Sequence, residues 1–139
     1  ELMTFGELHT LYKISKPDIR REIAGSYNLH EEILLSWLGS LRHVRNICAH
    51  HSRLWNRELY SRPKIPPEKH FPAWYDPKKI DNARIFAILC ILKTLLDAIA
   101  PQSQWPFRLE YLLSIYSDIP LREMGFPNKW NAGSIWGPP

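Results

Sequence analysis

The spacing of apolar residues predicts helices over nearly the whole chain. Apolar positions recur at helical intervals from Leu29 to about Trp55, and again, most densely, from Asp76 to Ala100. Shorter helices are expected after Thr4, where Glu7 completes a capping-box pattern, after Pro17, and over roughly residues 107–119. No segment alternates at a period of two, which would indicate strands. We therefore expect an all-α fold, a bundle of four to five helices.

Two segments fall outside this helical pattern. Five prolines between Pro63 and Pro77 predict a long loop. The tail from Gly125 to Pro139 is rich in proline, glycine and tryptophan, and we expect it to lie across the bundle as an ordered strap. At 139 residues the chain is expected to form one domain, residues 1–139, around a single core. Because it begins with Glu1 rather than Met, we expect it to be the C-terminal part of a longer protein.

The same periodicity selects the core. The residues expected there are Leu38, Leu41, Val44, Cys48, Phe86, Leu89, Leu92 and Leu96. Both cysteines, Cys48 and Cys90, lie in apolar helical patterns, which is typical of reduced cysteines in a cytoplasmic protein. No apolar stretch approaches the roughly 20 residues needed to span a bilayer, so no membrane contact is expected.

Charge is concentrated in one stretch. The net charge is only +4, yet the segment "LRHVRNICAHHSRLWNR", residues 41–57, holds four arginines and three histidines and no acidic residue. On a continuous helix the polar residues of this segment lie in one stripe, with Arg45 on the flank of the stripe. The apolar residues lie on the opposite side of the helix. The polar stripe consists of Arg42, His43, Asn46, His50, Arg53 and Arg57. The apolar side consists of Trp37, Leu41, Val44, Cys48 and Trp55. His50 should then face outward beside Asn46, and His51 should be a hydrogen-bonded core histidine.

These residue types suggest chemistry on phosphates. Arginine forks bind phosphate oxygens, and imidazoles transfer protons near neutral pH. A two-metal nuclease needs carboxylates to hold its cations, and this face has none. A zinc site of His43, Cys48 and His50 is disfavoured because Cys48 points away from both histidines on a helix. We therefore expect no metal and no other cofactor. A solvated basic surface remains the plain alternative.

The motif itself resembles a known signature. "RNICAHH", with Arg45, Asn46 and His50, resembles the Arg-Asn-x-x-x-His signature of the HEPN superfamily of helical ribonucleases. The longer block "SWLGSLRHVRNICAHHSRLWNR" resembles the Abi-like (AbiD/AbiF-type) abortive-infection proteins of bacteria. "MTFGELHTLY" near the start and "MGFPNKW" near the end are similar to that family too. The resemblance implies a HEPN-like bundle.

For function, the resemblance implies a metal-independent endoribonuclease, a toxin of an antiphage defence system. It would cut RNA by attack of the 2′-hydroxyl on the adjacent phosphate, at a composite site in a dimer. The implied catalytic residues are Arg45, Asn46 and His50, and the implied RNA-binding residues are Arg42, His43, Arg53 and Arg57. RNA is the expected substrate, with a structured RNA cofactor left open. The expected assembly is a homodimer or a pairing with an N-terminal segment.

Two alternatives remain from the sequence. The same fold could be a non-catalytic module that holds RNA or a partner protein through Arg45 and His50. It could also be a helical scaffold in which the motif pairs with an N-terminal segment, so that the polar face is buried.

Overall fold

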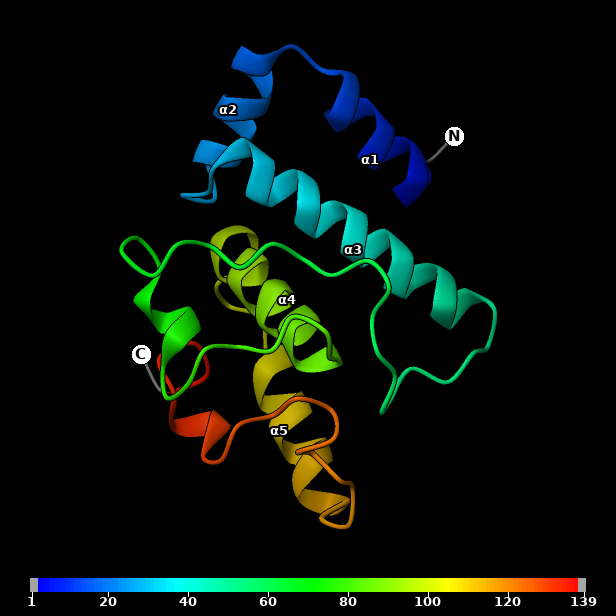
Figure 1. Ribbon diagram of the computed structural model, residues 1–139, viewed down its shortest axis with the longest axis vertical. Coiled ribbons are helices and arrows are strands. Elements are labelled where there is room, and N and C mark those ends of the chain that lie inside the picture. Colours follow the sequence, from blue (N-terminus) through cyan, green and yellow to red (C-terminus); the bar gives the residue numbers. More distant parts are fainter. Residues whose placement is uncertain (1–2, 138–139) are drawn as a thin grey trace.

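The computed structural model describes residues 3–137, which form five α-helices and two short 3₁₀ helices (Figure 1). The elements are α1 (Phe5–Ile14), α2 (Pro17–Gly25), α3 (Glu31–Ala49), η1 (Pro72–Tyr75), α4 (Ile85–Ile99), α5 (Trp105–Ile115) and η2 (Trp130–Ala132). Within residues 3–137 there is no β-strand, so the predicted all-α class is confirmed. None of the described helices is long and apolar enough to cross a membrane. The last two residues of the predicted strap, 138–139, lie outside the described residues.

Local signals place the starts of the first two helices. The Thr4 hydroxyl accepts a hydrogen bond from the Glu7 amide at 3.2 Å, and the Thr4 amide donates to the Glu7 carboxylate at 2.7 Å, as the predicted capping box requires. Pro17 lies in the first turn of α2, as expected. The apolar helix α4 begins only at Ile85, because the residues before it form a turn in which the Ala83 amide donates to the Asp81 carboxylate at 2.9 Å.

The helices are arranged around α3. Helices α1 and α2 pack on one side of α3, and α4 packs on another, with α5 following below α4 (Figure 1). The long loop between α3 and α4 runs back along α3, where the Lys64 amide donates to the Ser36 hydroxyl at 2.9 Å. This proline-rich segment, predicted as a loop, therefore contributes directly to the packing.

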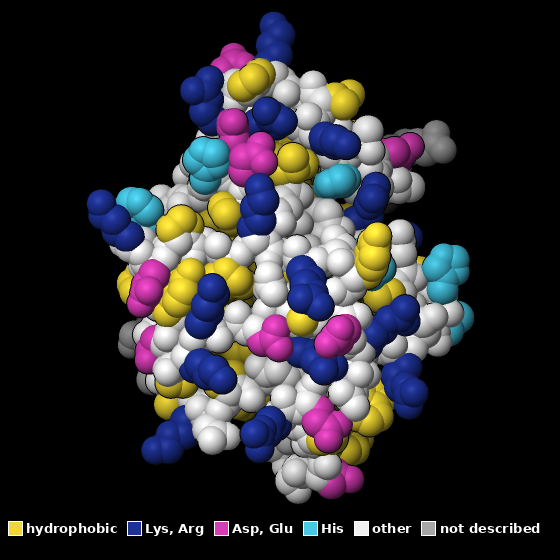
Figure 2. All heavy atoms as spheres, viewed as in Figure 1, with side chains coloured by type: hydrophobic (Ala, Val, Ile, Leu, Met, Phe, Trp, Pro, Cys, Tyr) yellow, Lys and Arg dark blue, Asp and Glu magenta, His cyan; other side chains and the backbone are white. Residues whose placement is uncertain are grey.

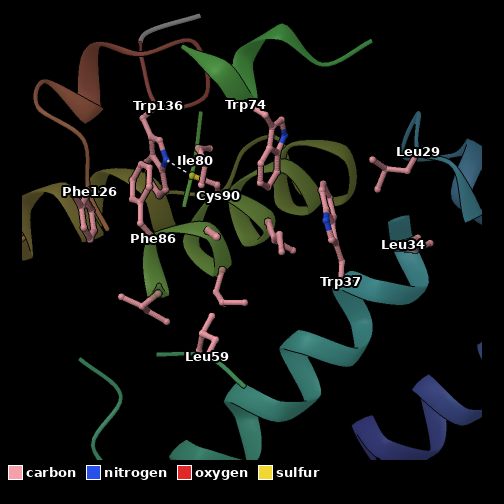
Figure 3. Close-up of a cluster of buried hydrophobic side chains, with 14 of the residues drawn as sticks. Leu29, Leu34, Trp37, Leu59, Trp74, Ile80, Phe86, Cys90, Phe126 and Trp136 are labelled. Carbon is pink, nitrogen blue, oxygen red and sulfur yellow. Dashed lines mark hydrogen bonds between the residues drawn. The ribbon is translucent and has the colours of Figure 1, made fainter. Parts of the chain in front are cut away.

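Two tryptophans join the loop to α3. Trp37 is fully buried, and its ring lies 5.1 Å from the ring of Trp74 in η1 (Figure 3). The Trp37 indole nitrogen donates to the carbonyl oxygen of Lys64 at 2.9 Å. A buried indole N–H needs such a partner, so Trp37 stabilises both the core and the path of the loop.

The C-terminal segment packs across α4 as the predicted strap. Phe86 of α4 lies 4.5 Å from Phe126 and 6.3 Å from Trp136, measured between ring centroids (Figure 3). The Trp136 indole donates to the Cys90 sulfur at 3.2 Å. These aromatic contacts bury Phe126 and Trp136 and fix the described part of the tail.

Of the eight residues predicted for the core, one is buried and five pack against the buried cluster. Phe86 is buried, and the residues partly buried are Leu38, Leu41, Val44, Leu89, Leu92 and Leu96. The placement of Cys48 in the core is wrong, because Cys48 is exposed. Ile47, one residue earlier and about 100° away on the helix, takes the buried position instead.

The two thiols should therefore differ in reactivity. Burial raises the pKa of the Cys90 thiol to about 12, although the Trp136 hydrogen bond opposes that shift, while Cys48 is open to solvent. We expect the folded protein to titrate one thiol with Ellman's reagent, and the protein in denaturant to titrate two. Rapid reaction of both thiols in the folded protein would contradict this placement of Cys90.

Candidate functional site

The basic helix ends earlier than its periodicity predicts. Helix α3 ends at Ala49, and His50 is its C-cap, with its amide donating to the Asn46 carbonyl at 3.1 Å. His51 has a φ of +53°, its amide donates to Cys48, and the Ser52 amide donates to Ile47 at 3.1 Å. This pair of bonds is a Schellman motif, in which the left-handed position is usually glycine. The predicted extension of the helix to Trp55 is therefore wrong.

Ending the helix at Ala49 changes the roles of the residues that follow. His50 is exposed, as predicted. His51 is exposed as well, so its prediction as a core histidine is wrong: it occupies the position at which the chain turns. Trp55 is 43% exposed rather than on the core side, because the helical wheel does not apply beyond residue 49.

Because His51 has a left-handed backbone conformation, the folded protein should be more stable with glycine at this position. We expect His51→Gly to raise the free energy of unfolding by roughly 0.5–1 kcal/mol, because glycine has no Cβ to strain at positive φ. Urea unfolding followed by circular dichroism measures this. The matched control, Ala49→Gly in the last helical turn, should instead lower stability by up to about 1 kcal/mol. A loss of stability in His51→Gly would mean that its side chain makes a stabilising contact.

The three residues predicted as catalytic lie at the exposed end of α3. Arg45 and Asn46 are both exposed, and the Arg45 guanidinium donates to the Asn46 side-chain oxygen at 3.3 Å. His50 follows one turn later and is joined to Asn46 through the backbone. Figure 2 shows histidine and basic side chains at the edge of the molecule where α3 ends. An arginine fork, an amide and an imidazole are thus presented to solvent within six consecutive residues.

The residues predicted to bind RNA fall into separate places. Arg42 is exposed and lines a groove with residues of α1 such as Leu11. His43 is half-buried, with its ring 6.5 Å from the ring of Tyr60. Arg53 and Arg57 lie in the loop after α3 rather than on the helix, and they line one shallow hollow. The single polar stripe that a continuous helix would produce is therefore divided between helix and loop.

The positive charge of this region is not neutralised by neighbours. Within residues 3–137, the ion pairs involve none of the arginines in the basic stretch, Arg42, Arg45, Arg53 and Arg57. Nearby Arg62 and Arg84 differ, because both pair with Glu58, at 3.6 and 3.8 Å. In the part of the chain that is described, no three His, Cys, Asp or Glu side chains are grouped to hold a metal ion. Metal independence stays a prediction.

Aromatic residues beside the site are not apparent in the helical pattern. The Arg53 guanidinium carbon lies 5.6 Å from the ring centroid of Trp55, a cation–π contact. Tyr60, next to His43, is 93% exposed. Periodicity placed Trp55 on the core side and made no prediction for Tyr60, and the earlier helix end explains why Trp55 faces solvent.

Another histidine, His9 of α1, packs against α3. The His9 Nδ1 atom is buried without a hydrogen-bond partner within the described residues, and its Nε2 would lie 3.4 Å from a Cβ added to Gly39 of α3. Burial lowers the pKa of His9, and the positive charges of Arg42 and Lys13 lower it further. His9 therefore resists protonation in the folded protein.

This lowered pKa predicts a loss of stability in acid. Between the lowered pKa and the ordinary value of 6.5, the unfolded chain binds more protons at this position than the folded chain. The contribution of neutral His9 to the free energy of unfolding is therefore complete above pH 6.5. It is lost as the pH falls through the lowered pKa of His9 in the folded protein. We expect His9→Gln to show a smaller drop in urea midpoint between neutral pH and about pH 5 than the wild type. His70→Gln, at an exposed loop position, should keep the wild-type slope, and an unchanged slope in His9→Gln would contradict the assignment.

Fold and site together describe an all-helical protein whose third helix ends in an exposed, carboxylate-free cluster of arginine, asparagine and histidine. Comparison with known families identifies this part of the molecule: residues 1–56 match the Abi-like protein family. The match spans α1, α2, α3 and the start of the following loop, and it supports the resemblance of the motif block. It stops before Met124–Trp130, so the family resemblance there stays a prediction. No curated protein and no solved structure gave a significant match.

Proposed function

We propose that this protein is an endoribonuclease of a bacterial abortive-infection system, which cuts RNA without a metal ion. The observation that carries the proposal is the exposed end of α3, where Arg45 donates to Asn46 and His50 lies one turn further on. The match of residues 1–56 to the Abi-like family supports it, because that match contains the whole motif.

The residues fit a reaction in which RNA supplies its own nucleophile. The 2′-hydroxyl loses its proton to one imidazole and attacks the adjacent phosphorus. The bond from phosphorus to the 5′ oxygen breaks, and a second imidazole protonates that oxygen, which leaves a 2′,3′-cyclic phosphate. An imidazole such as that of His50 can both accept and donate a proton near neutral pH. Arg45 would hold the non-bridging oxygens as charge builds on them, and Asn46 would orient Arg45 or the phosphate.

One chain supplies a single His50, whereas this reaction uses a base and an acid. We therefore propose a two-fold dimer in which the ends of two α3 helices face each other, so that each copy contributes Arg45 and His50. The groove between α1 and Arg42 offers exposed apolar surface for such an interface, since Leu11 and the 72%-exposed Ile14 of α1 line it. Sedimentation should show a dimer. A fully active monomer would refute this arrangement.

The test of the reaction uses end-labelled single-stranded RNA in the presence of EDTA. We expect cleavage that yields a 2′,3′-cyclic phosphate and that stops when the scissile nucleotide lacks its 2′-hydroxyl. Loss of cleavage in EDTA with recovery in Mg²⁺, or equal cutting of DNA, would reject the mechanism. Binding of RNA without any cleavage would leave the non-catalytic module as the better description.

A further inference from the structure

The loop after α3 is held in a defined position. Leu59 is buried, and its amide donates to the Ala83 carbonyl at 2.8 Å. The Asn56 side chain donates to the Glu123 carboxylate at 2.9 Å and accepts from Arg84 at 3.5 Å. These anchors come from the segment before α4, from α4's N-cap and from the C-terminal segment, so the loop presents its other side chains on a supported surface.

That surface is aromatic and cationic. Ser52, Arg53, Trp55, Asn56 and Arg57 line a hollow of about 470 Å³, and no acidic side chain is among them. Trp55 is 43% exposed, although a folded protein usually covers a tryptophan ring more fully. Arg53 lies over the Trp55 ring, and neither Arg53 nor Arg57 takes part in an ion pair within residues 3–137.

An exposed ring that shares a hollow with two guanidinium groups, neither in an ion pair within residues 3–137, suits one kind of ligand. An unpaired nucleobase stacks on an aromatic face, and the phosphates on either side of it bind arginines. A base within a duplex is stacked on its neighbours and cannot offer its face to the ring. Tyr60, 93% exposed on the same loop, lies beside His43 of α3, so a second exposed ring lies next to the helix that carries Arg45 and Asn46.

We propose that the hollow at Trp55 is a base-binding subsite for single-stranded RNA, in which an unpaired base stacks on Trp55 while Arg53 and Arg57 contact the neighbouring phosphates. This inference rests on the proposed ribonuclease function and adds the requirement that the substrate be unpaired near the cleaved bond. It also assigns Trp55 a role in selecting the substrate rather than in the chemistry.

The test measures binding with cleavage removed. In a His50→Ala background, fluorescence anisotropy of a short labelled single-stranded RNA should show that Trp55→Ala weakens binding by roughly 10- to 100-fold. Trp55→Phe should restore most of the affinity because it keeps an aromatic face, whereas Trp55→Leu should not. Tyr111→Ala, which removes an exposed aromatic side chain of α5, is the matched control and should bind like the parent.

The results separate the subsite from the reaction. Equal binding by Trp55→Ala and the parent, equally tight and equally Trp55-dependent binding of duplex RNA, or no binding of single-stranded RNA by the parent would each overturn the subsite. Binding that depends on Trp55 in a protein that never cleaves RNA would support the subsite and reject the ribonuclease function. If the wild type cleaves RNA and Trp55→Ala does not change the KM, the ribonuclease function would be supported and the subsite rejected.

Discussion

Replacing His50 with alanine is expected to lower the rate of RNA cleavage by at least about 100-fold, the usual contribution of a general acid or base. In the proposed dimer the substitution removes base and acid together, so the loss should appear in kcat rather than in KM. His50 is exposed at the C-cap of α3, and its contact with Asn46 uses only the backbone amide, so the fold should survive the change. Single-turnover cleavage of labelled RNA measures the effect.

The matched control is His70→Ala. His70 is exposed in the loop that precedes η1, away from the basic stretch in sequence, and this variant should cleave at the wild-type rate. Arg45→Ala should also lower the rate of RNA cleavage, as His50→Ala does, since it removes the guanidinium that would hold the phosphate. Wild-type rates in His50→Ala would remove this histidine from the reaction, whatever the remaining residues do.

The largest effect on stability is expected at Trp37. We expect Trp37→Ala to lower the free energy of unfolding by about 3–5 kcal/mol, because it leaves a cavity where a fully buried indole packs on Trp74. It also leaves the Lys64 carbonyl without its 2.9 Å donor. Urea unfolding followed by circular dichroism measures the loss.

Two other substitutions locate the source of that loss. Trp37→Phe keeps an aromatic ring but removes the indole donor, so it should cost clearly less than Trp37→Ala. Trp55→Ala removes the same side chain from an exposed position and should change stability by no more than about 0.5 kcal/mol. Comparable losses at Trp37 and Trp55 would show that the core is not where the packing places it.

Periodicity was sufficient to predict the helices but not where each one ends. The apolar pattern through Val44 and Leu89 correctly indicated α3 and α4, because their buried faces repeat at helical spacing. The end of α3 could not be predicted in the same way. Its left-handed residue is His51, and neither glycine nor proline marks the position. The error of six residues at the helix end then placed Trp55 on the wrong side.

The candidate site was predictable only as far as it is local in sequence. Arg45, Asn46 and His50 lie within six consecutive residues at the end of α3, so their proximity follows from the local path of the chain. The hollow at Trp55 depends on Asn56, whose partners are Arg84 and Glu123, 28 and 67 residues away. No spacing rule predicts such distant contacts, because they follow from how the loop and the C-terminal segment fold over α4.

The contact between Asn56 and Glu123 also has a consequence for the order in which the molecule is completed during synthesis. The basic helix emerges from the ribosome before the C-terminal segment, and the loop beside that helix lacks one of its anchors until residue 123 has been translated. The same segment completes a second contact, because the Phe86 amide donates to the Met124 carbonyl at 3.2 Å. A nascent chain therefore carries Arg45 and His50 before the proposed RNA-binding surface beside them is complete. For a protein proposed to destroy RNA, the translating ribosome and its message are the nearest substrates, and we expect late completion of the proposed subsite to limit binding of both by the nascent chain.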